Sequence, residues 1–91
     1  MQEKVIFTLH ALQRMKERGV SEAQVYAAIR NGQKEQAQRG LSQYKLNLEF
    51  NREWDGRFYR VQQVVPIVAE EPGKYIVVTV YAFYFQEGEE R

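Results

Sequence analysis

The chain has 91 residues, of which 44% are hydrophobic and 27% charged, so length and composition predict one small globular domain. It contains no cysteine and one histidine, which excludes disulfides and thiolate nucleophiles and argues against a structural zinc site. The net charge of +1 falls short of the basic footprint of a dedicated nucleic-acid-binding protein. No apolar run is long enough for a bilayer span or a signal peptide, so we expect a cytoplasmic protein without membrane contact. We also expect that it uses no metal and no cofactor.

Two short helices are predicted in the first third of the chain. Thr8 can cap the start of the first helix, and Gly19 can end it in a left-handed conformation. The segment Ser21-Glu22-Ala23-Gln24 fits a capping box at the start of the second helix, which Asn31-Gly32 ends. Because the turn between them is short, the two helices form a helix hairpin.

One edge of the first helix carries His10, Arg14 and Arg18 at positions i, i+4 and i+8. They adjoin an apolar arc composed of Leu9, Ala11, Leu12 and Met15. Two interpretations are open at this point. The row can be an ordinary solvated helix face, with Arg14 paired to Glu17, or it can be a functional site. Residues 1–60 hold eleven lysines and arginines against seven acidic residues, a balance that allows a locally basic face.

From Gln33 onward the hydrophobic period changes from 3.6 to 2, which predicts a sheet. Long strands are expected near residues 44–50, 57–68 and 75–85, joined by turns at Asp55-Gly56 and Pro72-Gly73, and residues 33–38 can add a short fourth. Residues 3–7 are also short and β-like, and Pro66 indicates an edge or bulge position. The expected fold class is α+β, with the helix hairpin packed on one face of a three- to four-stranded antiparallel meander. It forms a single domain over residues 1–86, followed by a frayed acidic tail at 87–91.

The last strand is apolar on both faces. We expect its even, aliphatic positions to pack under the helices and its odd positions, including Tyr81, Phe83 and Phe85, to lie on the open side of the sheet. Either the sheet curls enough to bury part of both faces, or the aromatic side binds a partner, a second copy or stacked bases. We predict a homodimer or a bound partner through this face.

Two segments resemble a family of small uncharacterised bacterial domains. The stretch FTLHALQRMKERGVSEAQVYAAIRNGQ has the family's His, Ala and Arg-Met pattern, an Arg-Gly end to the first helix, a Ser-initiated second helix and an Asn-Gly stop. The stretch YIVVTVY at 75–81 is similar to the family's closing strand. That family has been grouped with RelE-like toxins and barnase- or colicin-like ribonucleases, which share a helix-pair-plus-sheet fold.

The resemblance implies a toxin-type endoribonuclease that works without metal. In this interpretation His10 is the general base and Tyr81 is the acid or a stacking ring. Positive charge for the phosphate would come from four arginines: Arg14, Arg18, Arg57 and Arg60. Arg57 and Arg60 can equally pair with Glu49 across the sheet.

A second hypothesis uses the same fold without catalysis. The domain would then be a protein- or RNA-binding module, or it would self-associate. In the toxin case the expected partner is an antitoxin whose strand or helix covers the aromatic face formed by Tyr81, Phe83 and Phe85.

Overall fold

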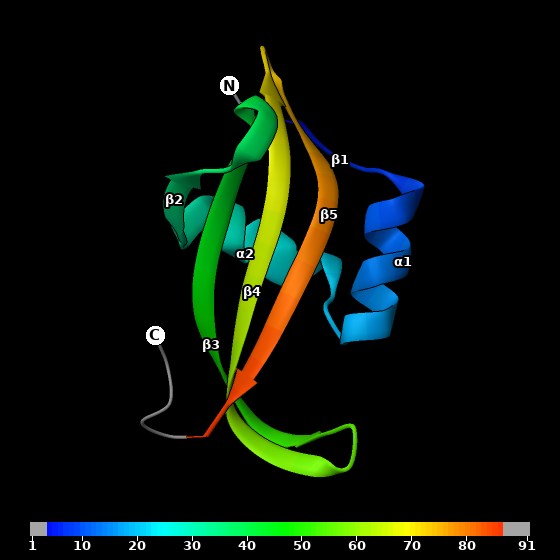
Figure 1. The fold of residues 1–91 in the computed structure, drawn as a ribbon, viewed down its shortest axis with the longest axis vertical. Helices are drawn as coiled ribbons and strands as arrows, with labels where there is room; N and C mark the ends of the chain where they lie inside the picture. The colour runs from blue at the N-terminus through cyan, green and yellow to red at the C-terminus, as the bar shows by residue number, and fades with distance from the viewer. Residues whose placement is uncertain (1–3, 87–91) are drawn as a thin grey trace.

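The computed structural model describes residues 4–86 as two helices packed on a single five-stranded sheet (Figure 1). The expected acidic tail at 87–91 lies outside the described residues. In chain order the elements are β1 (Lys4–Phe7), α1 (Leu9–Arg18), α2 (Glu22–Asn31), β2 (Gln33–Gln36), the 3-10 turn η1 (Gln38–Gly40), β3 (Ser42–Trp54), β4 (Arg57–Glu71) and β5 (Lys74–Phe85). The α+β class, the helix hairpin and the short strand after Gly32 are therefore confirmed.

The sheet is mixed, with strand order β1-β5-β4-β3-β2. Strands β2 to β5 pair antiparallel with their sequence neighbours, as expected. The first strand instead pairs parallel with the last, with Lys4 opposite Lys74 and Phe7 opposite Val77. The prediction of an entirely antiparallel sheet of three to four strands is therefore wrong. Period-2 patterns identify strands, but they carry no information about a partner 70 residues away.

The predicted helix caps hold α1 and α2 in place. The Thr8 hydroxyl accepts a hydrogen bond from the Ala11 amide at 3.0 Å and lies 3.1 Å from the Val77 carbonyl oxygen, which fixes the start of α1 on β5. Gly19 ends α1 with φ +73°, in the left-handed region. At α2 the Ser21 and Gln24 side chains bond each other's backbone N–H, which is the reciprocal capping box.

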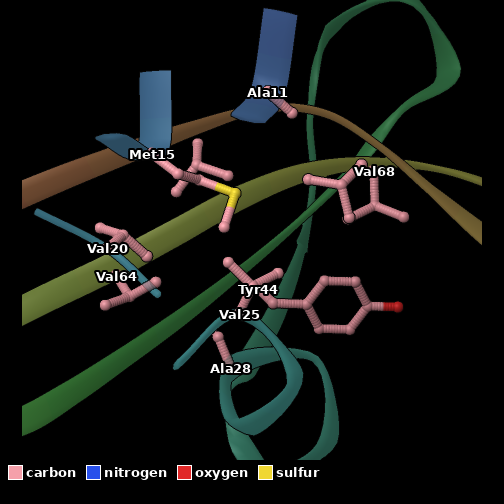
Figure 2. Close-up of a cluster of buried hydrophobic side chains, with 10 residues drawn as sticks. Ala11, Met15, Val20, Val25, Ala28, Tyr44, Val64 and Val68 are labelled. Atoms are coloured by element: carbon pink, nitrogen blue, oxygen red, sulfur yellow. The ribbon is translucent and has the colours of Figure 1, made fainter. Parts of the chain in front are cut away.

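Both helices cover the same face of the sheet, where the hydrophobic core lies (Figure 2). Side chains from α1, α2 and the turn between them meet the inward side chains of β3, β4 and β5. The buried members of this core are Ala11, Met15, Val20, Val25, Ala28, Tyr44, Val64, Val68, Val77 and Val80. The apolar arc predicted on α1 is narrower than expected. Leu9 is 86% exposed, so Ala11 and Met15 provide the buried contact of that helix.

A β-bulge in β5 explains why this strand is apolar on both faces. Ile67 of β4 lies opposite Thr79, whereas the next residue, Val68, lies opposite Val77, so Val78 is an extra residue. Tyr75 and Val77 belong to the core before the bulge, and Val80 and Ala82 belong to it afterwards. The predicted assignment of even positions to the helix side is therefore right after the bulge and wrong before it.

Pro66, on β4, lies one residue before the register shift between Ile67 and Val68 that this bulge in β5 produces. This strand is the central strand of the sheet, between β5 and β3, so the edge alternative is wrong and the bulge alternative holds. Pro66 has no N–H to donate to a neighbouring strand, which is tolerated where the ladder is already irregular.

Candidate functional site

The candidate site is the open face, meaning the face of the sheet away from both helices. Three alternate side chains of β5, Tyr81, Phe83 and Phe85, line a groove of about 420 Å³ on this face. The opposite wall comes from β3 and β4 and consists of Gln43, Lys45, Gln63 and Val65. Tyr81 and Phe83 are 43% and 47% exposed, which is unusual for two large rings on one strand. The structure therefore places all three predicted interface aromatics along one groove.

A wider depression of about 870 Å³ continues this groove toward the β2–β3 connection. It shares Gln43 and Tyr81 with the first groove and reaches Thr79 and Arg39. Arg39 has φ +61°, a left-handed conformation that is uncommon for a residue with a side chain. The second depression adds a cation to the end of the groove that is remote from Phe85.

The centre of the open face is covered although no helix lies on it. Val65 and Gln63 are each only 5% exposed, and they lie opposite Tyr81 and Phe83 on β5. The Gln63 amide donates to the Asn47 side-chain oxygen at 2.9 Å, so this polar group is satisfied. The middle of this face is therefore buried, whereas the two rings of β5 remain accessible.

Of the three residues in the predicted row on α1, only Arg18 contacts a side chain of the open face. Its guanidinium donates to the Val80 carbonyl at 2.7 Å, and its Cζ atom lies 5.0 Å from the centre of the Tyr81 ring. These contacts follow from the position of Arg18 in the last turn of α1, beside the edge of β5. They fix a permanent positive charge next to an exposed aromatic ring.

Arg14 and His10 lie elsewhere on α1. Arg14 forms an ion pair with Glu17 at 2.6 Å, as the alternative interpretation predicted, and this hydrogen bond holds the pKa of the Glu17 carboxyl below its usual value. His10 is exposed near the start of the helix. It lies eight positions before Arg18, which corresponds to about 12 Å along the helix axis.

Arg57 and Arg60 lie at the far end of the β3–β4 hairpin, which extends beyond the rest of the sheet (Figure 1). Arg57 lies opposite Trp54 and over the Tyr59 ring, with its Cζ atom 5.6 Å from the ring centre. The Trp54 and Tyr59 rings both contact Tyr84. Tyr84 lies seven residues, or roughly 20 Å, further along β5 than Val77, where the start of α1 is bound. The structure therefore brings Arg18 and Tyr81 together, whereas His10 lies at the start of α1 and Arg57 at the end of the β3–β4 hairpin.

Several polar residues of the open face were not recognised as site residues in the sequence. Lys45 and Asn47 are polar residues of the strand predicted near residues 44–50, in which polar and apolar side chains alternate. The alternation placed them on the open face but indicated no binding role. No sequence pattern indicated a role for Gln63 or Arg39. Gln63 belongs to a strand that was recognised by its apolar residues, and Arg39 belongs to the connection between two strands. Among residues 4–86, no three His, Cys, Asp or Glu side chains are grouped as metal ligands would be.

The fold and the open face define a small α+β domain with one sheet face covered by a helix hairpin and the other exposing aromatic rings. Residues 7–82 match the model of the family described as Domain of unknown function (DUF4258), and the chain belongs to this family. The match extends from the end of β1 to Ala82 in β5, so it includes the helix hairpin and most of the sheet. No curated protein and no solved structure matches the chain.

The resemblance to a family of small uncharacterised domains is therefore confirmed, whereas its grouping with RelE-like toxins and ribonucleases stays a prediction. Neither helix within residues 4–86 has the length and apolar character that a membrane span requires.

Proposed function

We propose that this domain binds RNA on the open face of its sheet, with unpaired bases stacked on Tyr81 and Phe83. The observation that carries the proposal is the exposure of these two rings, 43% and 47%, at alternate positions of one strand. Such positions are about 7 Å apart and project from the same side of the sheet. Aromatic side chains on a sheet are a common platform for the bases of single strands, because every base has a face that can stack.

The charges around the groove support an anionic partner at one end. Arg18 is fixed against Tyr81, and Lys45 and Arg39 line the groove and its continuation. Glu49 lies at the other end, opposite Val61, which in turn pairs with Phe85. We therefore expect phosphate contacts near Tyr81 and apolar contacts near Phe85.

Binding without cleavage is favoured over the metal-independent ribonuclease that the RelE-like grouping implies. A general base and a general acid must both reach one phosphodiester, each within hydrogen-bond distance of its proton. The side chain next to Tyr81 is Arg18, and His10 lies about 12 Å from it along the helix. This arrangement suits a cation and a stacking ring better than an acid–base pair.

The test is fluorescence anisotropy with a labelled single-stranded RNA at low salt. Phe83→Ser should weaken binding by at least about fivefold, because stacking one base on an aromatic ring contributes about 1–3 kcal/mol. Phe58→Ser is the matched control, since Phe58 is also 47% exposed but lies near the end of the β3–β4 hairpin, outside the groove. With two cations, Arg18 and Lys45, on phosphates, the logarithm of affinity should fall with the logarithm of salt with a slope of about −1.4.

Three results would contradict the proposal: no affinity in the parent protein at low salt, equal losses in the Phe83 and Phe58 variants, or a stable dimer that Phe83→Ser separates. The last result would assign the face to a second copy. RNA cleavage or growth arrest that His10→Ala abolishes would favour the toxin-type enzyme instead.

A further inference from the structure

A separate polar depression lies on the helix-bearing side of the molecule, away from the open face and its two hollows. We call it the junction pocket, because it is formed where the turn between α1 and α2 meets the end of β3. It has a volume of about 310 Å³, and its polar lining comes from Lys16, Ser21, Gln24 and Arg52. No carboxylate lines it.

Packing of the hairpin against the helix turn brings Arg52 to this place. The Trp54 ring is stacked on Tyr84, with centroids 5.4 Å apart and planes 19° apart. A methyl group added to Gly19 would lie only 2.7 Å from Trp54, so the indole rests directly on the helix turn. Arg52, two residues earlier, thereby lines the same pocket as Lys16, which lies 36 residues before it in the chain.

The two cations keep their hydrogen-bonding capacity. Arg52 lies with its Cζ atom 4.6 Å from the Phe50 ring centre. A cation held against a ring face in this way uses none of its N–H donors for that contact. Within the described part of the chain, neither Lys16 nor Arg52 forms an ion pair with a carboxylate. Ser21 and Gln24 satisfy each other through the capping box, so the positive charge dominates the pocket.

We propose that the junction pocket binds a phosphate group. A planar arginine offers paired N–H donors to two phosphate oxygens, and a lysine adds a compact charge from a second direction. The phosphate can belong to a small molecule or to the end of an RNA, and the recognition chemistry is the same. The site is independent of RNA binding on the open face, because it shares no residue with the groove.

The first test uses the full chain without substitution. Backbone amide resonances are followed by two-dimensional NMR while inorganic phosphate replaces chloride at constant ionic strength. Saturable shifts centred on the amides of Gly19, Ser21 and Gln24 are expected. Shifts that do not saturate, or that centre on other parts of the chain, would overturn the proposal whether or not RNA binds the open face.

The second test compares substitutions by calorimetry with inorganic phosphate. Lys16→Gln and Arg52→Gln should each weaken phosphate binding by about tenfold, since each removes a charge-assisted contact. Arg57→Gln is the control, because Arg57 is a hairpin arginine outside the pocket lining. Equal losses in all three variants would refute the assignment, as would unchanged binding in the first two, and a thermal melt verifies that each variant is folded.

The source of the phosphate is then assigned by competition. A short RNA with a 5′-phosphate that displaces inorganic phosphate, when its 5′-hydroxyl counterpart does not, identifies an RNA end as the ligand. If neither RNA competes, the site takes the phosphate of a small molecule. Both results support the pocket.

Discussion

Replacing Gly19 by alanine probes the tight contact between the turn after α1 and the Trp54 ring. Gly19 has φ +73°, and a Cβ there would lie 2.7 and 2.8 Å from two Trp54 ring carbons and 3.0 Å from the Tyr84 hydroxyl. The left-handed conformation costs a residue with a side chain about 1–2 kcal/mol. Overpacking against a ring held by stacking adds about 1–3 kcal/mol. We therefore expect Gly19→Ala to lower the free energy of unfolding by about 2–5 kcal/mol.

Gly40→Ala separates the two contributions. Gly40 also has φ +73°, but no atom lies within 4 Å of the position that its Cβ would occupy. The control should therefore lose the backbone contribution alone, about 1–2 kcal/mol. Unfolding in urea, monitored by circular dichroism, measures both variants. A change in midpoint at constant slope identifies a change in stability.

Equal losses in the two variants would refute this reasoning, because they would mean that Trp54 yields to the methyl group without cost. A further check is Trp54→Ala in the Gly19→Ala background. If the contact is the cause, the effect of Gly19→Ala should be smaller there than in the parent protein, and the double-mutant cycle measures the difference.

Three more predictions concern polar contacts. The Tyr44 hydroxyl, and after it the Lys34 ammonium, bond the Glu70 carboxylate and hold its pKa below the usual value. The stability from this group is therefore complete above the unfolded pKa of about 4.3 and is lost as the pH falls through the lower native pKa. Tyr44→Phe should reduce the decrease in the free energy of unfolding between pH 6 and pH 3, measured by unfolding curves at each pH. Arg18→Ala should destabilise by about 1–2 kcal/mol and Arg14→Ala by less than about 1 kcal/mol, because Arg18 bonds a backbone carbonyl and Arg14 only an exposed carboxylate. Thermal melts that rank them in the opposite order would contradict this. Gln62→Leu should cost about 1–3 kcal/mol in urea unfolding, because the fully buried amide bonds the Gly19 carbonyl, the Tyr84 hydroxyl and the Gln24 side chain; unchanged stability would show that these partners find water.

Local signals in the sequence predicted the local structure well. Thr8, Gly19 and the Ser21–Gln24 capping box define helix ends through contacts within a few residues, and each is present in the structure. The Asp55-Gly56 turn is also present, with both residues at positive φ. These features depend on short-range geometry, so residue type and spacing are sufficient to identify them.

Long-range features could not be predicted in the same way. The parallel pairing of β1, the extra residue Val78 and the central place of Pro66 all depend on which strands become neighbours. The candidate site shows the same limit. Helical spacing grouped His10, Arg14 and Arg18 on one edge of α1, but only the approach of β5 selects Arg18 as the residue that contacts Tyr81.

The parallel pairing of β1 with β5 has a consequence for synthesis on the ribosome. Residues of β1 and the Thr8 cap of α1 bond β5, the last element of the described residues 4–86. At a synthesis rate of about 5–20 residues per second, β5 is complete about 3–13 s after the end of α1. During that interval Ala11 and Met15 lack the strand they pack on, so the N-terminal third is exposed to chaperones and to other nascent chains. The domain therefore completes its fold only after β5 has been made, and a ribosome that stalls before Lys74 leaves a chain with an open core.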